Sequence, residues 1–265
     1  MRRYHDSISG QLLKIQGLYQ AKNRAAYSQE IAEGPQSARE ALTWAGDRVR
    51  DIVITEEALD RHPDIARLAE PHWTHVVPSK VLGQITADSQ GVLVVLNTAP
   101  VPAVEKVLEG ASLAILAVEM QDPGNAGTLI RTADAVGAAG VLFGSGSVDP
   151  NSPKVIRSAA GSTYHLPIVG GADPRTVISR AKRQGMQVLG ADGSGRLTLG
   201  GSGLDLGRPT LWVLGNEARG LAADLLARVD ESVAIPIPGR AESLNVSAAA
   251  AVCLYASVFA QMRQS

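Results

Sequence analysis

Polar side chains gather in three short segments of this chain, each of which also contains glycine or proline. They are residues 122–131, with Asn125 and Arg131; residues 215–220, with Glu217; and residues 236–245, with Ser243 and Asn245. Amide, hydroxyl, carboxylate and guanidinium groups can orient a substrate through hydrogen bonds and charge. These segments are therefore the first candidates for chemistry.

The first segment follows the apolar run 113–118. A helix is expected to begin near Asn125, which makes Asn125 a natural N-cap and places Arg131 about two turns further along the helix. One interpretation makes Asn125 only a cap and Arg131 an ordinary solvated cation. However, the neighbours of Arg131 are small or apolar, which favours a guanidinium that emerges through a packed face and anchors a phosphate or hydroxyl ligand.

The second segment opens directly after the apolar run 211–214. The pattern predicts backbone amides and the Glu217 carboxylate at the carboxyl end of a buried strand, where open α/β sheets bind ligands. A simple β-turn would account for Gly215. It would not account for the adjacent pair Asn216 and Glu217.

The third segment leads into the small-residue run 248–262. Ser243 is a plausible N-cap for this last helix, and its alanines and Cys253 are expected in the core. Asn245 is a polar residue in the first turn of an apolar helix, so it needs a hydrogen-bonding partner.

These segments are positioned by alternating strands and helices. Short apolar runs rich in Val, Ile and Leu indicate strands buried on both faces at 52–54, 92–96, 113–118, 141–143, 186–189, 211–214 and 233–237. Capping residues and first-turn prolines indicate helices at 35–45, 126–136, 153–160, 174–184 and 243–262. The pattern is typical of an α/β fold with a mostly parallel sheet.

Composition excludes several classes of protein. The 265 residues are 45% hydrophobic with a net charge of −1, which is incompatible with a disordered chain. We expect no membrane span and no secretion signal. The single cysteine cannot form a disulfide within the chain, which fits a reducing cytoplasm. His72 and His75 are interpreted as a surface pair, because no cluster of further ligands completes a metal site, and we expect none. The sequence also lacks the phosphate-loop, nucleophile-elbow and zinc-helix motifs.

Two unequal domains are expected. A Pro-containing stretch suggests a first domain at 1–98, a linker at 99–111 and a second domain at 112–265. Basic residues are enriched at 1–24, which contain five Lys and Arg residues and only one acidic residue, an Asp. Such a run is commonly a solvated helix face, but Lys22 and Arg24 are also candidates for phosphate contacts with a structured RNA.

Taken together, N-x-G-x-x-x-R at 125–131, G-N-E-x-x-G at 215–220 and I-P-x-x-x-x-x-E-S-L-N-V at 235–246 resemble the signature motifs of the SpoU/TrmH RNA 2′-O-ribose methyltransferases. The resemblance covers 112–265 and includes the middle segment 151–161. It extends through Arg24 and 32–34 into a first domain that looks like the ribosomal-protein-like substrate-binding domain of many members.

This resemblance implies a trefoil-knotted catalytic domain that uses S-adenosylmethionine. Arg131 would contact the target ribose and its phosphate, with the remaining polar residues, Asn125, Glu217, Ser243 and Asn245, orienting that arginine and the nucleotide. Backbone groups near Leu214, Gly215, Ile235 and Leu244 would hold the cofactor. Family members work as homodimers through the knotted domain, and the small-residue last helix is compatible with a close interface.

The resemblance also ranks the partners. A separate substrate domain favours ribosomal RNA over transfer RNA, with Lys22, Arg24 and Arg131 as RNA contacts. Two other readings remain open at this point: a non-catalytic RNA-binding or ribosome-assembly protein with the same fold, and a small-molecule α/β enzyme.

Overall fold

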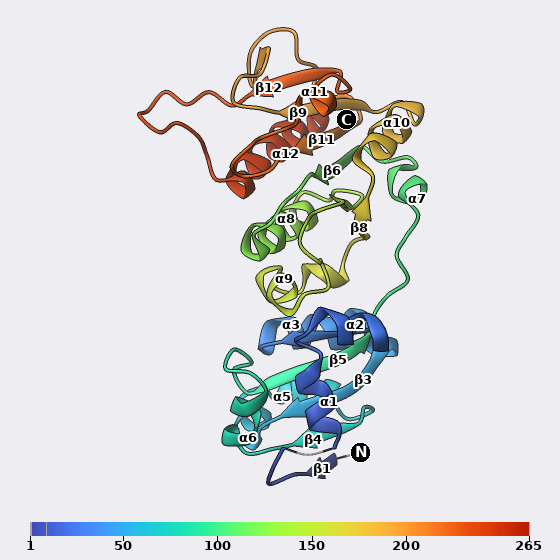
Figure 1. Ribbon diagram of the computed structural model, residues 1–265, viewed down its shortest axis with the longest axis vertical. Helices are drawn as coiled ribbons and strands as arrows, with labels where there is room; N and C mark the ends of the chain where they lie inside the picture. Colours follow the sequence, from blue (N-terminus) through green and yellow to red (C-terminus); the bar gives the residue numbers. More distant parts are fainter. Residues whose placement is uncertain (1, 9, 265) are drawn as a thin grey trace. The chain divides into compact units, whose positions relative to one another are not determined.

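The computed structural model describes residues 2–8 and 10–264. The chain divides into two compact units, Met1–Pro100 with Asn151–His165, and Val101–Pro150 with Leu166–Ser265. The division by contacts differs from the division expected from sequence in two segments. Asn151–His165 packs with the first unit, and residues 101–111, expected as part of a linker, belong to the second unit. Figure 1 shows both units and labels most of their helices and strands.

The first unit is built on a mixed five-stranded sheet. Its strands, in spatial order, are β1 (Arg2–Tyr4), β4 (Thr74–Val76), β3 (Val49–Ile54), β5 (Val92–Asn97) and β2 (Gln29–Glu33). The first three run parallel, whereas β5 is antiparallel to both of its neighbours. The expected strands at 52–54 and 92–96 are present and fully buried.

Helices cover both faces of this sheet. On one face α1 (Gln11–Gly17) and α6 (Ser79–Ile85) pack against alternate residues of β3 and β5, including Val53 and Leu93. The other face is covered by α3 (Pro35–Trp44), α4 (Glu56–Arg61), α5 (Pro63–Leu68) and α9 (Pro153–Ser158). A further helix, α2 (Ala21–Tyr27), precedes β2. The two-residue alternation of a strand separates these two cores.

The second unit contains a sheet of seven parallel strands. Their spatial order is β10 (Leu197–Thr198), β12 (Glu231–Ala234), β9 (Gln187–Ala191), β11 (Thr210–Leu214), β6 (Leu113–Ala117), β7 (Val141–Gly144) and β8 (Ile168–Ala172). Every pairing is parallel. Strand β11 lies between β6 and β9, so strands far apart in the sequence end side by side.

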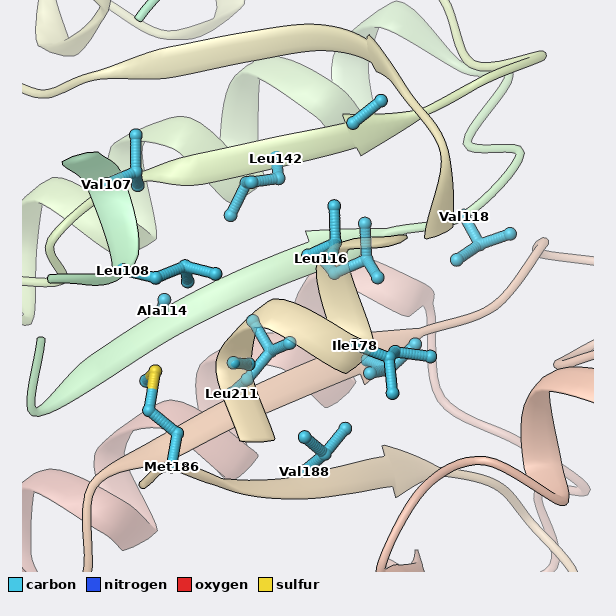
Figure 2. Close-up of a cluster of buried hydrophobic side chains, with 14 of the residues drawn as sticks. Val107, Leu108, Ala114, Leu116, Val118, Leu142, Ile178, Met186, Val188 and Leu211 are labelled. Atoms are coloured by element: carbon cyan, nitrogen blue, oxygen red, sulfur yellow. The ribbon is translucent and has the colours of Figure 1, made fainter. Parts of the chain in front are cut away.

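One face of this sheet is buried under α7 (Val104–Leu108), α10 (Pro174–Arg183) and α11 (Ala223–Leu226). Figure 2 shows the core, where Leu108 and Ile178 from the helices meet Leu116, Val188 and Leu211 from the strands. The near-continuous apolar sequences of β6 and β11 reflect burial on both faces of a parallel sheet.

The opposite face carries α8 (Pro123–Ala135) and α12 (Val246–Met262), which pack against each other and, for α12, against β11. The indole Nε1–H of Trp212 on β11 donates to Oγ of Ser257 on α12 over 2.9 Å, and both side chains are fully buried. This contact fixes the position of α12 against the sheet.

All five expected helices exist, but two of the expected caps were wrong. The N-cap of α8 is Asp122, whose Oδ1 accepts from the backbone N–H of Asn125 at 2.7 Å, and Pro123 occupies the first turn. The N-cap of α12 is Asn245 rather than Ser243. A first-turn proline is pre-organised for a helix, so α8 begins earlier than the position of Asn125 suggested.

No helix among the described residues is both long and apolar enough to cross a bilayer.

Candidate active site

The first two polar segments leave the sheet at neighbouring strand ends. Leu214, the last residue of β11, pairs with Ala117, the last residue of β6, and the N–H of Val118 donates to the carbonyl oxygen of Leu214 at 2.8 Å. Because parallel strands end at the same edge of a sheet, residues 119–125 and 215–220 emerge next to each other.

A tight turn holds Glu217 at this edge. The backbone of Asn216 and Gly220 exchanges two hydrogen bonds, of 3.1 and 2.9 Å, and Oδ1 of Asn216 accepts from the N–H groups of Ala218 and Arg219. A Cβ on Gly215 would lie 2.2 Å from the carbonyl carbon of Gly220, so only glycine fits there. Glu217 is therefore presented, exposed, at the tip of a closed turn.

The third segment joins the first at the start of α12. Oδ1 of Asn245 caps the helix by accepting from the N–H of Ser247 at 2.9 Å and of Ala248 at 3.4 Å. Nδ2 of Asn245 then donates to Oδ1 of Asn125 at 3.0 Å. Ser247, which is 4% exposed, donates its hydroxyl to the backbone oxygen of Asn125 at 3.1 Å or to Oδ1 at 3.2 Å.

These bonds form a chain with a defined direction. Cap geometry requires the oxygen of Asn245 to face the helix, so its NH2 faces Asn125. That contact uses the oxygen of Asn125, and its Nδ2 donates to Oε1 of Glu217 at 3.3 Å. An ionised carboxylate only accepts, so the sequence of donors runs from α12 through Asn245 and Asn125 to Glu217. Glu217 also accepts from Nδ2 of Asn216 at 3.4 Å and from the N–H of Asp122 at 3.5 Å.

Two of the expected catalytic residues stand outside this chain of bonds. Arg131 is exposed and forms no hydrogen bond or ion pair with any described residue, so the expectation that it emerges through a packed face was wrong. At 3.6 residues per turn it points roughly 120° away from Asn125 around α8. Ser243 is also exposed and has no hydrogen bond within the described part of the chain.

Sequence reasoning missed one residue that the structure adds to the site, Ser247, which is buried and contacts Asn125. Asn216 was noted in its motif without a role, and the structure shows that it closes the turn that carries Glu217. The signal for Ser247 was available: it is a second polar side chain in the first turn of an apolar helix, two positions after Asn245, and it required a partner for the same reason.

The residues expected to hold S-adenosylmethionine fit that group. Leu214 and Gly215 are buried at the end of β11, and Gly215 leaves no room for a side chain. Residues 235–244, which include Ile235 and Leu244, make no hydrogen bond with any other described residue. Their backbone N–H and C=O groups therefore remain available for a ligand with many polar atoms.

Two expectations about the first unit need correction. Arg24 is 6% exposed, and its Nη1 donates to the carbonyl oxygens of Leu18 and Tyr19 at 3.1 Å each, so its guanidinium holds the loop between α1 and α2 instead of facing a phosphate. Lys22 is exposed and stays a candidate. His75 is 2% exposed, so His72 and His75 are not a surface pair.

Comparison with known proteins identifies the class. Residues 112–255 match the sequence model of the SpoU rRNA Methylase family. The chain is 32% identical over 245 residues to the 23S rRNA (guanosine(2553)-2′-O)-methyltransferase RlmP of Bacillus subtilis, covering 90% of this chain and 92% of that protein. It is 36% identical over 225 residues to the 23S rRNA (uridine(2479)-2′-O)-methyltransferase of Streptomyces viridochromogenes, covering 83% and 72%. The chain therefore belongs to the SpoU rRNA methylase family.

Solved structures agree with this assignment. The SpoU methyltransferase AviRb of Streptomyces viridochromogenes, in complex with the cofactor AdoMet, superimposes with a TM-score of 0.82 at 25% identity, over 97% of this chain and 99% of that one. The fold is accordingly the trefoil-knotted, mostly parallel α/β methyltransferase fold preceded by a smaller α/β unit. The chain is an S-adenosylmethionine-dependent RNA 2′-O-methyltransferase.

Proposed function

We propose that this enzyme methylates a ribose 2′-hydroxyl of ribosomal RNA and that the hydrogen-bonded residues Asn125, Glu217 and Asn245 organise its active site. The observation that supports this most directly is the convergence of the three motif segments at one sheet edge through the bonds between these side chains. Relatives named as 23S rRNA methyltransferases favour ribosomal over transfer RNA.

S-adenosylmethionine, when bound, supplies a methyl group on a sulfonium centre. The chain's own task is to hold the 2′-oxygen in line with that carbon, because positioning alone can lower a barrier by about 7–11 kcal/mol. Arg131 suits the role of a phosphate and ribose anchor, since its guanidinium has no competing partner among the described residues. The bonds between the three polar segments keep α8 and its arginine in place.

Arg131 does not act as the base in this proposal. A guanidinium group has donors only and no acceptor for a proton. With the cofactor bound, its methyl group would be transferred to the 2′-oxygen, and the hydroxyl proton would pass to a phosphate oxygen or to water. The positive charge of Arg131 would stabilise the negative charge that develops on the 2′-oxygen.

The active form is proposed to be a homodimer through the knotted unit. Helix α12 exposes a continuous apolar stripe made of Val252, Tyr255, Phe259 and Met262, with Phe259 55% and Met262 70% exposed. A helix that is apolar all round is normally buried. A second copy of the chain would cover this stripe symmetrically, and α8, which carries Arg131, packs against the same helix. We also propose that the enzyme is cytoplasmic, because its proposed substrate belongs to the ribosome.

Incubation with methyl-labelled S-adenosylmethionine tests the proposal. We expect label in protein-free 23S rRNA transcribed in vitro and resistance of the labelled position to alkaline cleavage, which requires a free 2′-hydroxyl. Label on bulk transfer RNA alone would show that the substrate is transfer RNA and not ribosomal RNA. Cofactor binding without label on any RNA would support a non-catalytic RNA-binding protein.

A further inference from the structure

The first unit contains a polar hollow that the methyltransferase site does not use. It has a volume of about 490 Å³ and is lined by Gln11, Val49, Arg50, Asp51, Trp73 and His75. It lies at the start of β3 and β4, beside the first turn of α1. The hollow is shallow and open to solvent, so it suits a flat group that lies against the surface.

The floor of the hollow is fixed by a buried hydrogen-bond network. His75 and Asp51 are 2% and 7% exposed, and Nε2 of His75 lies 2.8 Å from Oδ1 of Asp51. Oδ2 of the same carboxylate accepts from Nε2 of Gln11 at 2.9 Å. His5 completes the network, with its Nε2 2.9 Å from Nδ1 of His75. Both carboxylate oxygens of Asp51 are thereby used.

The rim offers groups that are ready for a ligand. Trp73 is 39% exposed, and its ring forms a T-shaped contact with His75 at a centroid distance of 6.3 Å and an interplanar angle of 69°. The indole N–H of Trp73, the side-chain oxygen of Gln11 and the guanidinium of Arg50 form no hydrogen bond with any described residue.

We propose that this hollow binds one unpaired nucleotide of the substrate RNA, with the base stacked on Trp73, its edge read by the side-chain oxygen of Gln11, and its phosphate held by Arg50. An exposed aromatic face beside a free cation is the combination that binds single-stranded nucleic acid. The side-chain oxygen of Gln11 is an acceptor, so it matches an amino or imino N–H on the edge of an unpaired base. This inference rests on the proposed function, because it assumes an RNA substrate.

The location adds a second RNA contact that is independent of methyl transfer. None of the lining residues belongs to the three motif segments of the second unit. Loss of this contact should therefore weaken RNA binding and leave the chemical step unchanged once RNA is saturating.

Binding of a short oligouridine and of in vitro transcribed 23S rRNA tests the proposal, with duplex RNA of the same length as the oligouridine for comparison. Trp73→Ala should weaken binding of oligouridine and of 23S rRNA by about 5- to 150-fold, and Trp73→Phe, which keeps a stacking face, should restore most of it. The matched control is Trp44→Ala, which removes a 65% exposed indole elsewhere in the same unit.

The dependence of RNA affinity on salt concentration separates a phosphate contact by Arg50 from a general loss of RNA binding. Arg50→Ala should reduce the slope of log affinity against log salt by about 0.7, the contribution of one phosphate on a single strand, whereas Trp73→Ala should leave the slope unchanged. Arg67→Ala, which removes another exposed cation of this unit, serves as the control for overall charge.

The same samples distinguish the two proposals. If the wild type methylates 23S rRNA but Trp73→Ala binds it as tightly, or if duplex RNA binds as well as oligouridine, the nucleotide site is wrong and the enzymatic function stands. If the wild type binds oligouridine through Trp73 but methylates no ribosomal RNA, the substrate assignment fails instead. We expect Trp73→Ala to raise KM for RNA with kcat and cofactor affinity unchanged.

Discussion

The side-chain amide of Asn245 donates to Oδ1 of Asn125 over 3.0 Å, although 120 positions separate the two residues in the chain. The bond joins the first turns of α12 and α8 and fixes which way both amides point. It explains why Asn245, a polar residue at the start of an apolar helix, is tolerated: its oxygen caps α12 and its nitrogen reaches the neighbouring helix.

The direction of this bond leads to a prediction for Asn125→Asp. The new carboxylate cannot donate to Glu217, and it places a second negative charge where Nδ2 of Asn125 now lies 3.3 Å from Oε1 of Glu217. Loss of a hydrogen bond to a charged group corresponds to about 1.5–3 kcal/mol, so kcat/KM for methylation should fall at least about 10-fold. Adding Glu217→Gln, which restores a donor, should recover part of the loss. Full activity of Asn125→Asp would show that the bond is dispensable.

Arg131→Ala should abolish methylation and leave S-adenosylmethionine binding nearly intact. The guanidinium has no partner among the described residues, so its removal should not change the melting temperature either. Arg131→Lys keeps the charge but not the planar two-donor geometry and should restore only part of the activity. Calorimetric cofactor binding and label transfer measure the two effects separately, and retained turnover in Arg131→Ala would reject the assigned role.

Phe259→Asp should convert a dimer into a monomer. The substitution places a charge at the middle of the exposed apolar stripe of α12, where a second copy of the chain would otherwise exclude water. Light scattering after size-exclusion chromatography gives the mass directly. Leu13→Asp, at an apolar residue of the first unit that is 51% exposed, is the control and should leave the mass unchanged. A monomeric wild type would remove the basis of the dimer proposal.

Ser257→Ala should destabilise the second unit by about 1–3 kcal/mol. Its hydroxyl is the acceptor for the indole N–H of Trp212, and both side chains are fully buried, so the variant leaves a donor without a partner in the core. Urea denaturation followed by tryptophan fluorescence measures the change. Ser202→Ala, at an exposed loop position, should have no measurable effect.

Cys253 should remain unreactive in the folded protein up to strongly alkaline pH. Burial raises the pKa of its thiol from 9.0 to about 12. Because the folded-state pKa lies above the unfolded one, this group stabilises the fold fully below pH 9 and the contribution is lost as the pH rises from there toward 12. A thiol reagent should label the native protein slowly at pH 8, and Cys253→Ala should show a smaller loss of stability above pH 9 than the wild type. Rapid labelling of the native protein would contradict the burial.

Local patterns predicted most of the elements. The apolar runs at 113–118 and 211–214 are strands, and the proline-led segments at 35–45 and 174–184 are helices. Both kinds of element could be predicted because a strand buried on both faces needs consecutive apolar residues and a first helical turn favours proline. Strands β1, β2, β4, β8 and β10 were not predicted. Strand β2 contains Gln29, Glu30 and Glu33, and such polar residues hide the pattern even though both glutamates are buried.

Local sequence patterns did not predict which strands pair or whether they run parallel or antiparallel. Nothing in the run 92–96 indicates that β5 lies antiparallel to its neighbours, since strand direction depends on how the connecting segments fold. The knot was implied only by resemblance to a family, because most connections in proteins are unthreaded. The buried Arg24 and His75 show the same limit: charge and spacing suggested surface residues, and tertiary packing supplied them with partners.

By itself, the sequence determined the residue types of the site, their order in three motifs and the strand ends on which two of them lie. Only the tertiary structure decided which of them meet, joining Asn125 to Glu217 and Asn245, adding Ser247 and leaving Arg131 and Ser243 apart. The physical reason is that spacing along a chain fixes the chemistry and the local backbone, whereas a hydrogen bond between residues 92 or 120 positions apart depends on sheet order and helix packing.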